Sequence, residues 1–149
     1  MRVVLDTNVL ARAAGGPPSP AAELLTLCLE SPRVLCVSPF QLSELSRVLR
    51  YERVRRLHGM SDEVVDQFLQ YLQAASLTVE LAVDSVAAVV TSDPDDDPIV
   101  ATAVVAAAKV LCTLDRHLRT PAVVGYCAAY GIDVVTDVEL LQRLRPADQ

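Results

Sequence analysis

The sequence predicts an α/β fold with a parallel sheet and helices on both of its faces. Two observations predict it: short β-branched runs alternate with helical patterns, and no internal repeat or linker divides the chain. At 149 residues the chain has the length of one domain with a sizeable core. We therefore expect a single domain over residues 1–149.

Strands and helices follow one another along the chain in a regular order. The expected strands are short and rich in valine, leucine and isoleucine: Arg2–Leu5, Val34–Val37, Thr78–Leu81, Val110–Thr113 and Ile132–Val135. The expected helices separate or follow them: Ala21–Glu30, Pro39–Arg50, Asp62–Ala75, Pro98–Ala108, Pro121–Tyr130 and Asp137–Leu144.

Capping residues mark where several of these helices begin. Ser38–Gln41 reads as a capping box with proline at the first helical position, and Thr136–Glu139 reads as another. Thr120 before Pro121 is a further helix start. These local signals agree with the boundaries that the alternation predicts.

The composition excludes several classes of protein. A hydrophobic content of 52% excludes intrinsic disorder, and a net charge of −6 means that any contact with nucleic acid needs a local basic patch. The longest uncharged apolar run, Pro98–Ala108, is far shorter than the roughly 20 residues of a membrane span. Because Met1 and Arg2 lead directly into a strand, we expect no signal peptide and a cytoplasmic protein.

The cysteines and histidines do not favour disulfides or zinc. The four cysteines lie in apolar segments without C-x-x-C spacing, so we expect small buried hydrophobic residues: Cys28, Cys36, Cys112 and Cys127. With two histidines in the chain, a zinc site is improbable.

The strongest functional signal is the acidic run Asp93-Pro94-Asp95-Asp96-Asp97 before an apolar helix. Carboxylates this dense repel one another, and a divalent cation bound by oxygen atoms relieves the repulsion. Two alternatives stay open. Asp97 alone suits a helix cap, and a solvated acidic loop explains the other three.

Two further acids follow directly on expected strands, Asp6 on the first and Asp115 on a later one. Ligands of open α/β sheets bind outside the carboxyl ends of the strands, where the strand order reverses, so both acids are expected to face that crevice. The alternative for each is a polar turn or a helix cap.

Glu44 is placed by helical periodicity. On a helical wheel it falls between Phe40 and Val48, inside the apolar arc. A carboxylate in such a position has to be paired or bound to metal, and an ion pair at the edge of the arc is the alternative. A group of carboxylates selects a hard cation, Mg²⁺ or Mn²⁺.

These residues, in this order, resemble the PIN domain family, in particular its toxin components of bacterial toxin–antitoxin pairs. The motifs are Asp6-Thr7-Asn8, Ser38-Pro39 leading to Glu44, Asp93 to Pro98, and Thr113-Leu114-Asp115. The resemblance implies a Rossmann-like, three-layer α/β/α sandwich with a central, mostly parallel five-stranded sheet. It also implies a Mg²⁺- or Mn²⁺-dependent ribonuclease acting on RNA, a small antitoxin partner and, as often in this family, a homodimer.

The resemblance assigns roles to individual residues. The family's catalytic and metal-binding acids correspond to Asp6, Glu44, Asp97 and Asp115, and Asp96 is an additional ligand. Thr7 or Asn8 would orient Asp6, and Thr113 matches a hydroxyl position. Leu114 departs from the family, which often has a small or polar residue there.

A basic stretch is the candidate RNA-binding site. It contains five of the 13 lysines and arginines: Arg47, Arg50, Arg53, Arg55 and Arg56. The alternative is a solvated helical face with Glu52 among the arginines.

Two other enzyme classes fit poorly, and one rival function stays open. An aspartyl-phosphate phosphatase needs a second acid where Asn8 stands, and a phospho-receiver domain needs a late lysine, whereas Lys109 is the only one. The open rival is a non-catalytic PIN-like module that binds RNA or protein and retains a metal site.

Overall fold

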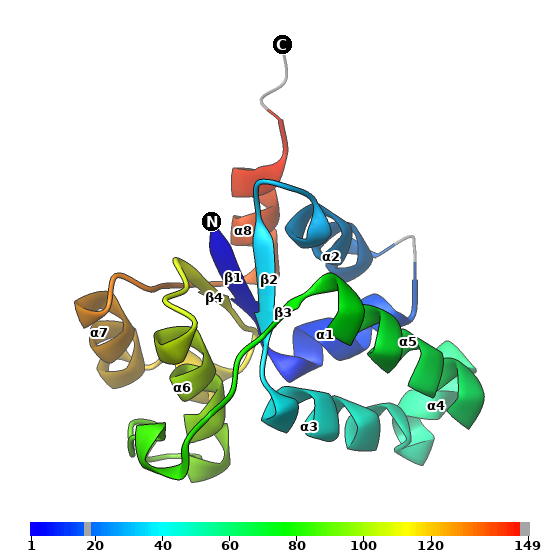
Figure 1. Ribbon diagram of the computed structural model, residues 1–149, viewed down its shortest axis with the longest axis horizontal. Coiled ribbons are helices and arrows are strands. Elements are labelled where there is room, and N and C mark those ends of the chain that lie inside the picture. Colours follow the sequence, from blue (N-terminus) through cyan, green and yellow to red (C-terminus); the bar gives the residue numbers. More distant parts are fainter. Residues whose placement is uncertain (17–18, 147–149) are drawn as a thin grey trace.

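The computed structural model describes residues 1–16 and 19–146. Its centre is a five-stranded parallel sheet with the order β3-β2-β1-β4-β5. The strands are β1 (Arg2–Leu5), β2 (Val34–Val37), β3 (Leu77–Thr78), β4 (Val110–Cys112) and β5 (Asp133–Val135). Helices lie on both sides of the sheet, which confirms the predicted three-layer α/β/α class (Figure 1).

Alternate side chains of the strands fill two separate cores, because successive residues of a strand point to opposite faces. Val3 and Leu5 join one hydrophobic cluster and Val4 joins the other. The first cluster is covered by α1 (Thr7–Ala14), α2 (Pro20–Leu29), α3 (Pro39–Leu49), α5 (Asp62–Ala75) and α8 (Asp137–Leu144). The second is covered by α6 (Asp97–Val105) and α7 (Pro121–Ala129).

Two helices were not predicted. Helix α1 follows Asp6 directly and buries Val9, Leu10 and Ala13 in the first core. Helix α4 (Glu52–His58) buries no residue, so its sequence carries no apolar period by which to recognise it. It ends at Gly59, whose positive φ of 66° closes the helix in the left-handed conformation.

The predicted ends of two elements were wrong. Strand β3 was expected at Thr78–Leu81 but covers Leu77–Thr78, because as an edge strand it pairs only with β2. Helix α6 was expected to continue to Ala108 but ends at Val105, and Ala107 then has a left-handed φ of 51°. Short 3₁₀ turns add η1 (Val83–Ser85), η2 (Pro94–Asp96) and η3 (Arg116–Arg119).

The predicted helix caps are confirmed. The hydroxyl groups of Ser38, Thr120 and Thr136 accept hydrogen bonds from backbone N–H groups three residues further on. All four cysteines are buried and free, as expected of small apolar side chains. In the part of the chain that the structure describes, no helix has the length and hydropathy needed to cross a bilayer.

The strand order reverses at one point in the sheet. The chain adds β2 and β3 on one side of β1 and β4 and β5 on the other, so the order reverses between β1 and β4. The two strand ends are joined there, because the backbone N–H of Asp6 donates to the carbonyl of Cys112 at 2.9 Å. A ligand crevice is expected at this point.

Candidate metal centre

Asp6 lies at the reversal point and is held by both of its oxygen atoms. It is 4% exposed, and its Oδ1 accepts a hydrogen bond of 2.7 Å from the backbone N–H of Thr7. Its Oδ2 accepts one of 2.8 Å from the hydroxyl of Thr113. Burial raises the pKa of Asp6 to about 6 against the effect of these bonds, and the charges of Asp115 and Glu44 raise it further.

Thr113 connects the ends of β1 and β4. Its hydroxyl donates to Asp6 and accepts a hydrogen bond of 3.0 Å from the backbone N–H of Asp115. Asp115 begins η3, where its Oδ1 accepts from the backbone N–H of His117 at 2.8 Å. Asp6 and Asp115 therefore cap α1 and η3, and both bond the hydroxyl of Thr113. Their role in a metal site stays a prediction.

Three carboxylates approach one another beside this pair. Asp93, Asp96 and Asp115 each offer an oxygen atom, and these atoms lie within 4.8 Å of one another. We call these three residues the acidic cluster. Burial raises the pKa of Asp96 to about 8, helped by a hydrogen bond with Asp115 and by the charges of Asp115, Asp6 and Asp93. One oxygen of Asp96, Oδ2, is buried and has no hydrogen-bond partner among the described residues.

Asp97 makes different contacts from the three residues of the acidic cluster. It is the first residue of α6 and does not cap it; its Oδ1 instead accepts backbone N–H groups of Val89 at 2.9 Å and Val90 at 2.7 Å. The helix-cap interpretation of Asp97 was therefore wrong. These bonds tie the segment that precedes the acidic run to α6, and the role of Asp97 as a metal ligand stays a prediction.

The acids of the site have no basic partner among the residues that the structure describes. Glu44 is half-buried on α3 and near enough to Asp6 to raise its pKa. None of the ion pairs within residues 1–16 and 19–146 includes Glu44, Asp6 or a member of the acidic cluster. The ion pair that would have explained Glu44 without a metal is thus not found among them.

The comparisons with known proteins agree with this architecture. A family model for the PIN domain matches residues 2–117. The chain belongs to the PIN domain family. The match confirms the resemblance seen in the sequence and spans every residue proposed for the acidic site, from Asp6 to Asp115.

A solved structure has the same fold as this PIN domain. It is the crystal structure of VapBC2 from Rickettsia felis bound to a DNA fragment from their promoter. The similarity has a TM-score of 0.62 at 15% sequence identity, and it covers 91% of this chain and 98% of that chain. No curated protein sequence matches the chain.

The PIN domain also contains polar residues that the sequence analysis did not connect with the site. Gln41 on α3 is fully buried and donates from Nε2 to the carbonyl of Leu5 at 2.8 Å, directly before Asp6. His117 lies with Nδ1 2.9 Å from the hydroxyl of Ser92, so it joins η3 to the segment before Asp93. The sequence offered one signal for Gln41, its position one helical turn before Glu44.

The residues expected to orient Asp6 divide into two kinds. Thr7 acts through its backbone N–H, and its own Oγ1 is buried without a partner among the described residues. Asn8 is exposed, and no side-chain hydrogen bond is recorded for it in residues 1–16 and 19–146. Thr113 therefore makes the side-chain contact with Asp6.

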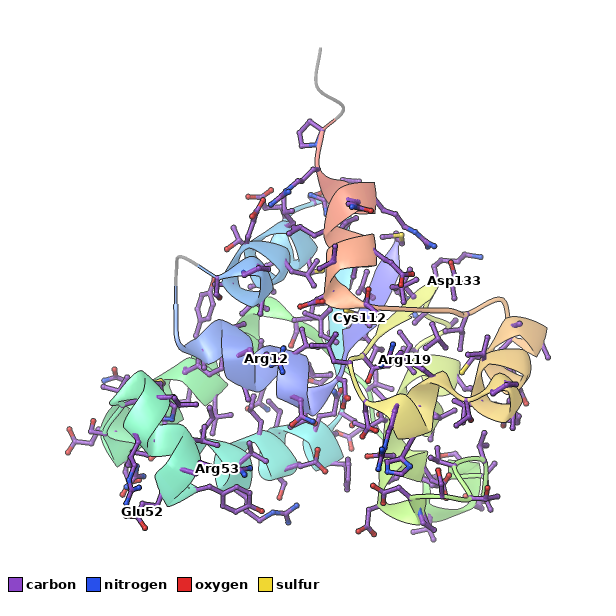
Figure 2. The ribbon with its side chains drawn as sticks, turned by 180° about the vertical axis from the view of Figure 1, so that it is seen from behind. Arg12, Glu52, Arg53, Cys112, Arg119 and Asp133 are labelled. Atoms are coloured by element: carbon purple, nitrogen blue, oxygen red, sulfur yellow. The ribbon has the colours of Figure 1, made fainter. Side chains whose placement is uncertain are left out.

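The basic stretch of the PIN domain is mostly engaged with acids of its own surface. Arg50 pairs with Asp62 and Asp66, Arg55 pairs with Asp62, and Arg56 pairs with Glu52. Figure 2 shows Arg53 on α4, well away from Arg119 near the end of β4. A role of these arginines in holding RNA stays a prediction.

Proposed function

We propose that this PIN-domain protein is a metal-dependent endoribonuclease and the toxin of a toxin–antitoxin pair. One observation carries the proposal. Carboxylates from three parts of the chain meet where the strand order reverses, and burial and mutual repulsion raise the pKa values of Asp6 and Asp96. Titratable groups perturbed in this way gather at functional sites.

The donor set suits Mg²⁺ or Mn²⁺. Carboxylate oxygens are the ligands these ions prefer, and Asp96 Oδ2 is a buried oxygen without a partner in the part of the chain that the structure describes. We assign the metal to Asp6, Asp96, Asp97 and Asp115, with Glu44 as a ligand or a neighbour and with Asp93 added by the geometry. When bound, the ion would supply Lewis-acid stabilisation of phosphoryl charge and a lower pKa for water.

The residues of the chain supply position and charge. The hydroxyl of Thr113 and the N–H of Thr7 hold the carboxylate of Asp6 in one orientation, so it needs little reorganisation to act. Asp97 anchors the segment before the acidic run, which places Asp93 and Asp96 near Asp115. In this mechanism all six carboxylates are catalytic or metal-binding groups.

The family and the similarity to VapBC2 support an antitoxin partner. The proposal includes RNA as the substrate, a small antitoxin as a protein partner, a homodimer as the assembly and the cytoplasm as the location. Co-expression with the product of a small neighbouring reading frame, followed by light scattering, tests the partner and the assembly together.

The test of the catalytic proposal is an Asp6→Asn variant. We expect the wild-type protein to cleave single-stranded RNA with Mn²⁺ and the variant to keep its fold but lose this cleavage. Asp84→Asn, which changes an exposed acid in η1, is the matched control and should retain activity.

A calorimetric Mn²⁺ titration accompanies the nuclease assay. Mn²⁺ binding without RNA cleavage by the wild-type protein would favour the non-catalytic module. Full activity of Asp6→Asn would remove Asp6 from the mechanism. A wild-type protein that neither binds Mn²⁺ nor cleaves RNA would overturn the proposal.

A further inference from the structure

Two arginines follow the acidic cluster without being neutralised by it. Arg116 is the residue after Asp115, and Arg119 lies three positions further, both in η3 and both exposed. Arg119 Nη2 is 3.4 Å from the carbonyl of Leu114, so its guanidinium lies at the end of β4. No ion pair within residues 1–16 and 19–146 includes either arginine.

A third arginine lies in the last turn of α1, the helix that Asp6 caps. Helix α1 begins after Asp6, and Arg12 is exposed about 9 Å further along the helix, at 1.5 Å per residue. In the view of Figure 2, Arg12 on α1 and Arg119 beside η3 are labelled to either side of Cys112, at the end of β4. The hydrogen bonds of Asp6 with Cys112 and Thr113 join the start of α1 to the end of β4.

The arginines between Arg47 and Arg56 contrast with this arrangement. Arg50, Arg55 and Arg56 already have carboxylate partners on α4 and α5, which would have to be released before they bound a phosphate. Arg47 and Arg53 are exposed, but they lie at the far end of α3 and on α4. Glu44, the acid of α3, lies midway along that helix.

A phosphodiester that approaches an acidic site needs a cation close by. The chain has a net charge of −6, so its overall field repels nucleic acid, and local guanidinium groups have to compensate for this. Arginine suits the task because its planar group binds two phosphate oxygens at once. We propose that Arg116 and Arg119, assisted by Arg12, form a phosphate-binding rim for single-stranded RNA. This inference rests on the proposed ribonuclease function.

The experiment compares two double variants that remove the same charge. Arg116→Ala/Arg119→Ala removes the rim. Arg47→Ala/Arg53→Ala removes two arginines of the alternative RNA-binding stretch, which form no ion pair within residues 1–16 and 19–146. Binding of labelled single-stranded RNA is measured by fluorescence anisotropy in chelator over a range of salt concentrations. We expect the rim variant to bind about tenfold more weakly, with a salt slope lower by about 1.4, or about 0.7 per phosphate contact. The control should keep the wild-type affinity and slope.

Further variants and measurements distinguish the rim from the rest of the site. Arg116→Lys/Arg119→Lys should restore the salt slope but only part of the affinity, since lysine keeps the charge without the fork. Arg12→Ala should have the smallest effect. With Mn²⁺, the rim variant should show a raised KM, an unchanged kcat and an unchanged calorimetric Mn²⁺ affinity.

The outcomes separate this inference from the catalytic proposal. If the rim variant keeps the wild-type RNA affinity and salt slope, or if only the control loses affinity, the rim proposal is overturned. The catalytic proposal is not affected by that result. An inactive wild-type protein whose RNA binding still depends on the rim would count against the nuclease only. Absence of RNA binding by the wild-type protein would overturn the rim as well.

Discussion

Helix α3 connects two charged regions that are built in opposite ways. Midway along the helix, Glu44 lies close to Asp6 and to carboxylates that no arginine or lysine of the described residues neutralises. Just past its end, Arg50 bonds Asp66 of α5 at 2.6 Å and pairs with Asp62, which also pairs with Arg55. The residue types are similar, but only the second region balances its own charge.

The difference separates a structural charge cluster from a functional one. The balanced network links the end of α3 with α4 and α5, and it needs no ligand. An unbalanced acidic cluster destabilises the folded chain until a cation or a proton arrives, and such local conflicts are expected at functional sites. The predictions below change one region and use the other as its control.

The largest effect is expected for Asp115→Asn. This residue belongs to the acidic cluster, its backbone N–H donates to the Thr113 hydroxyl, and its Oδ1 accepts from the backbone N–H of His117. The variant therefore loses a charge at the centre of the site. We expect Mn²⁺-dependent RNA cleavage to fall by about 10³-fold, which corresponds to about 4 kcal/mol of transition-state stabilisation. Initial rates on a labelled RNA measure it.

Asp66→Asn is the matched control, because it also removes one carboxylate but from the balanced region. Its cleavage rate should stay within about twofold of the wild-type rate. Equal losses in the two variants would mean that the comparison between the regions does not reflect function.

The second largest effect is the increase in the free energy of unfolding when the metal binds. An ion that binds only the folded state at 100 times its Kd raises the free energy of unfolding by about 2.7 kcal/mol. We expect this increase with Mn²⁺ in the wild-type protein and a much smaller one in Asp96→Asn, which removes the buried oxygen without a partner. Urea unfolding with and without Mn²⁺ measures both, and equal increases in the two proteins would exclude Asp96 as a ligand.

The third effect is a dependence of stability on pH in the metal-free protein. The pKa values of Asp6 and Asp96 in the folded state, about 6 and about 8, lie above the ordinary value of 3.8. The folded state therefore binds more protons than the unfolded state between about pH 4 and pH 8, and stability falls as the pH rises through this window. For Asp6, a shift of about two units corresponds to roughly 2–3 kcal/mol.

Variants that replace an acid by its uncharged amide test the sign of this pH dependence. Asp96→Asn should abolish the fall between about pH 6 and pH 8, and Asp6→Asn should reduce it at lower pH. Chemical unfolding at a series of pH values in chelator measures both. A wild-type protein that gains stability as the pH rises from 5 to 8 would contradict the repulsion inferred from the geometry.

The fold was largely predictable because its signals are local. Strand composition and the caps at Ser38, Thr120 and Thr136 depend on neighbouring residues and were confirmed. Helix α1 was missed because Asp6 and the residues after it favour a turn as much as a helix cap. The position at which β3 ends was missed because pairing with β2, a long-range contact, decides it.

The site was predictable in its chemistry but not in its full geometry. Asp6 and Asp115 could be placed because both follow strands whose carboxyl ends meet. Within the acidic run, the sequence does not say which carboxylate points where. The 3₁₀ turn η2 brings Asp96 to Asp115, whereas Asp97, one residue later, points to the backbone of Val89 and Val90.

The smallest effect is expected in the balanced region. Arg50→Ala removes a partly exposed side chain whose partners, Asp62 and Asp66, are well exposed, and ion pairs between exposed groups contribute little. The Tm should fall by no more than a few degrees, while RNA cleavage and Mn²⁺ affinity stay unchanged. If cleavage fell tenfold with an unchanged Tm, the arginines between Arg47 and Arg56 would belong to the RNA-binding site after all, and charge balance would not distinguish the two regions.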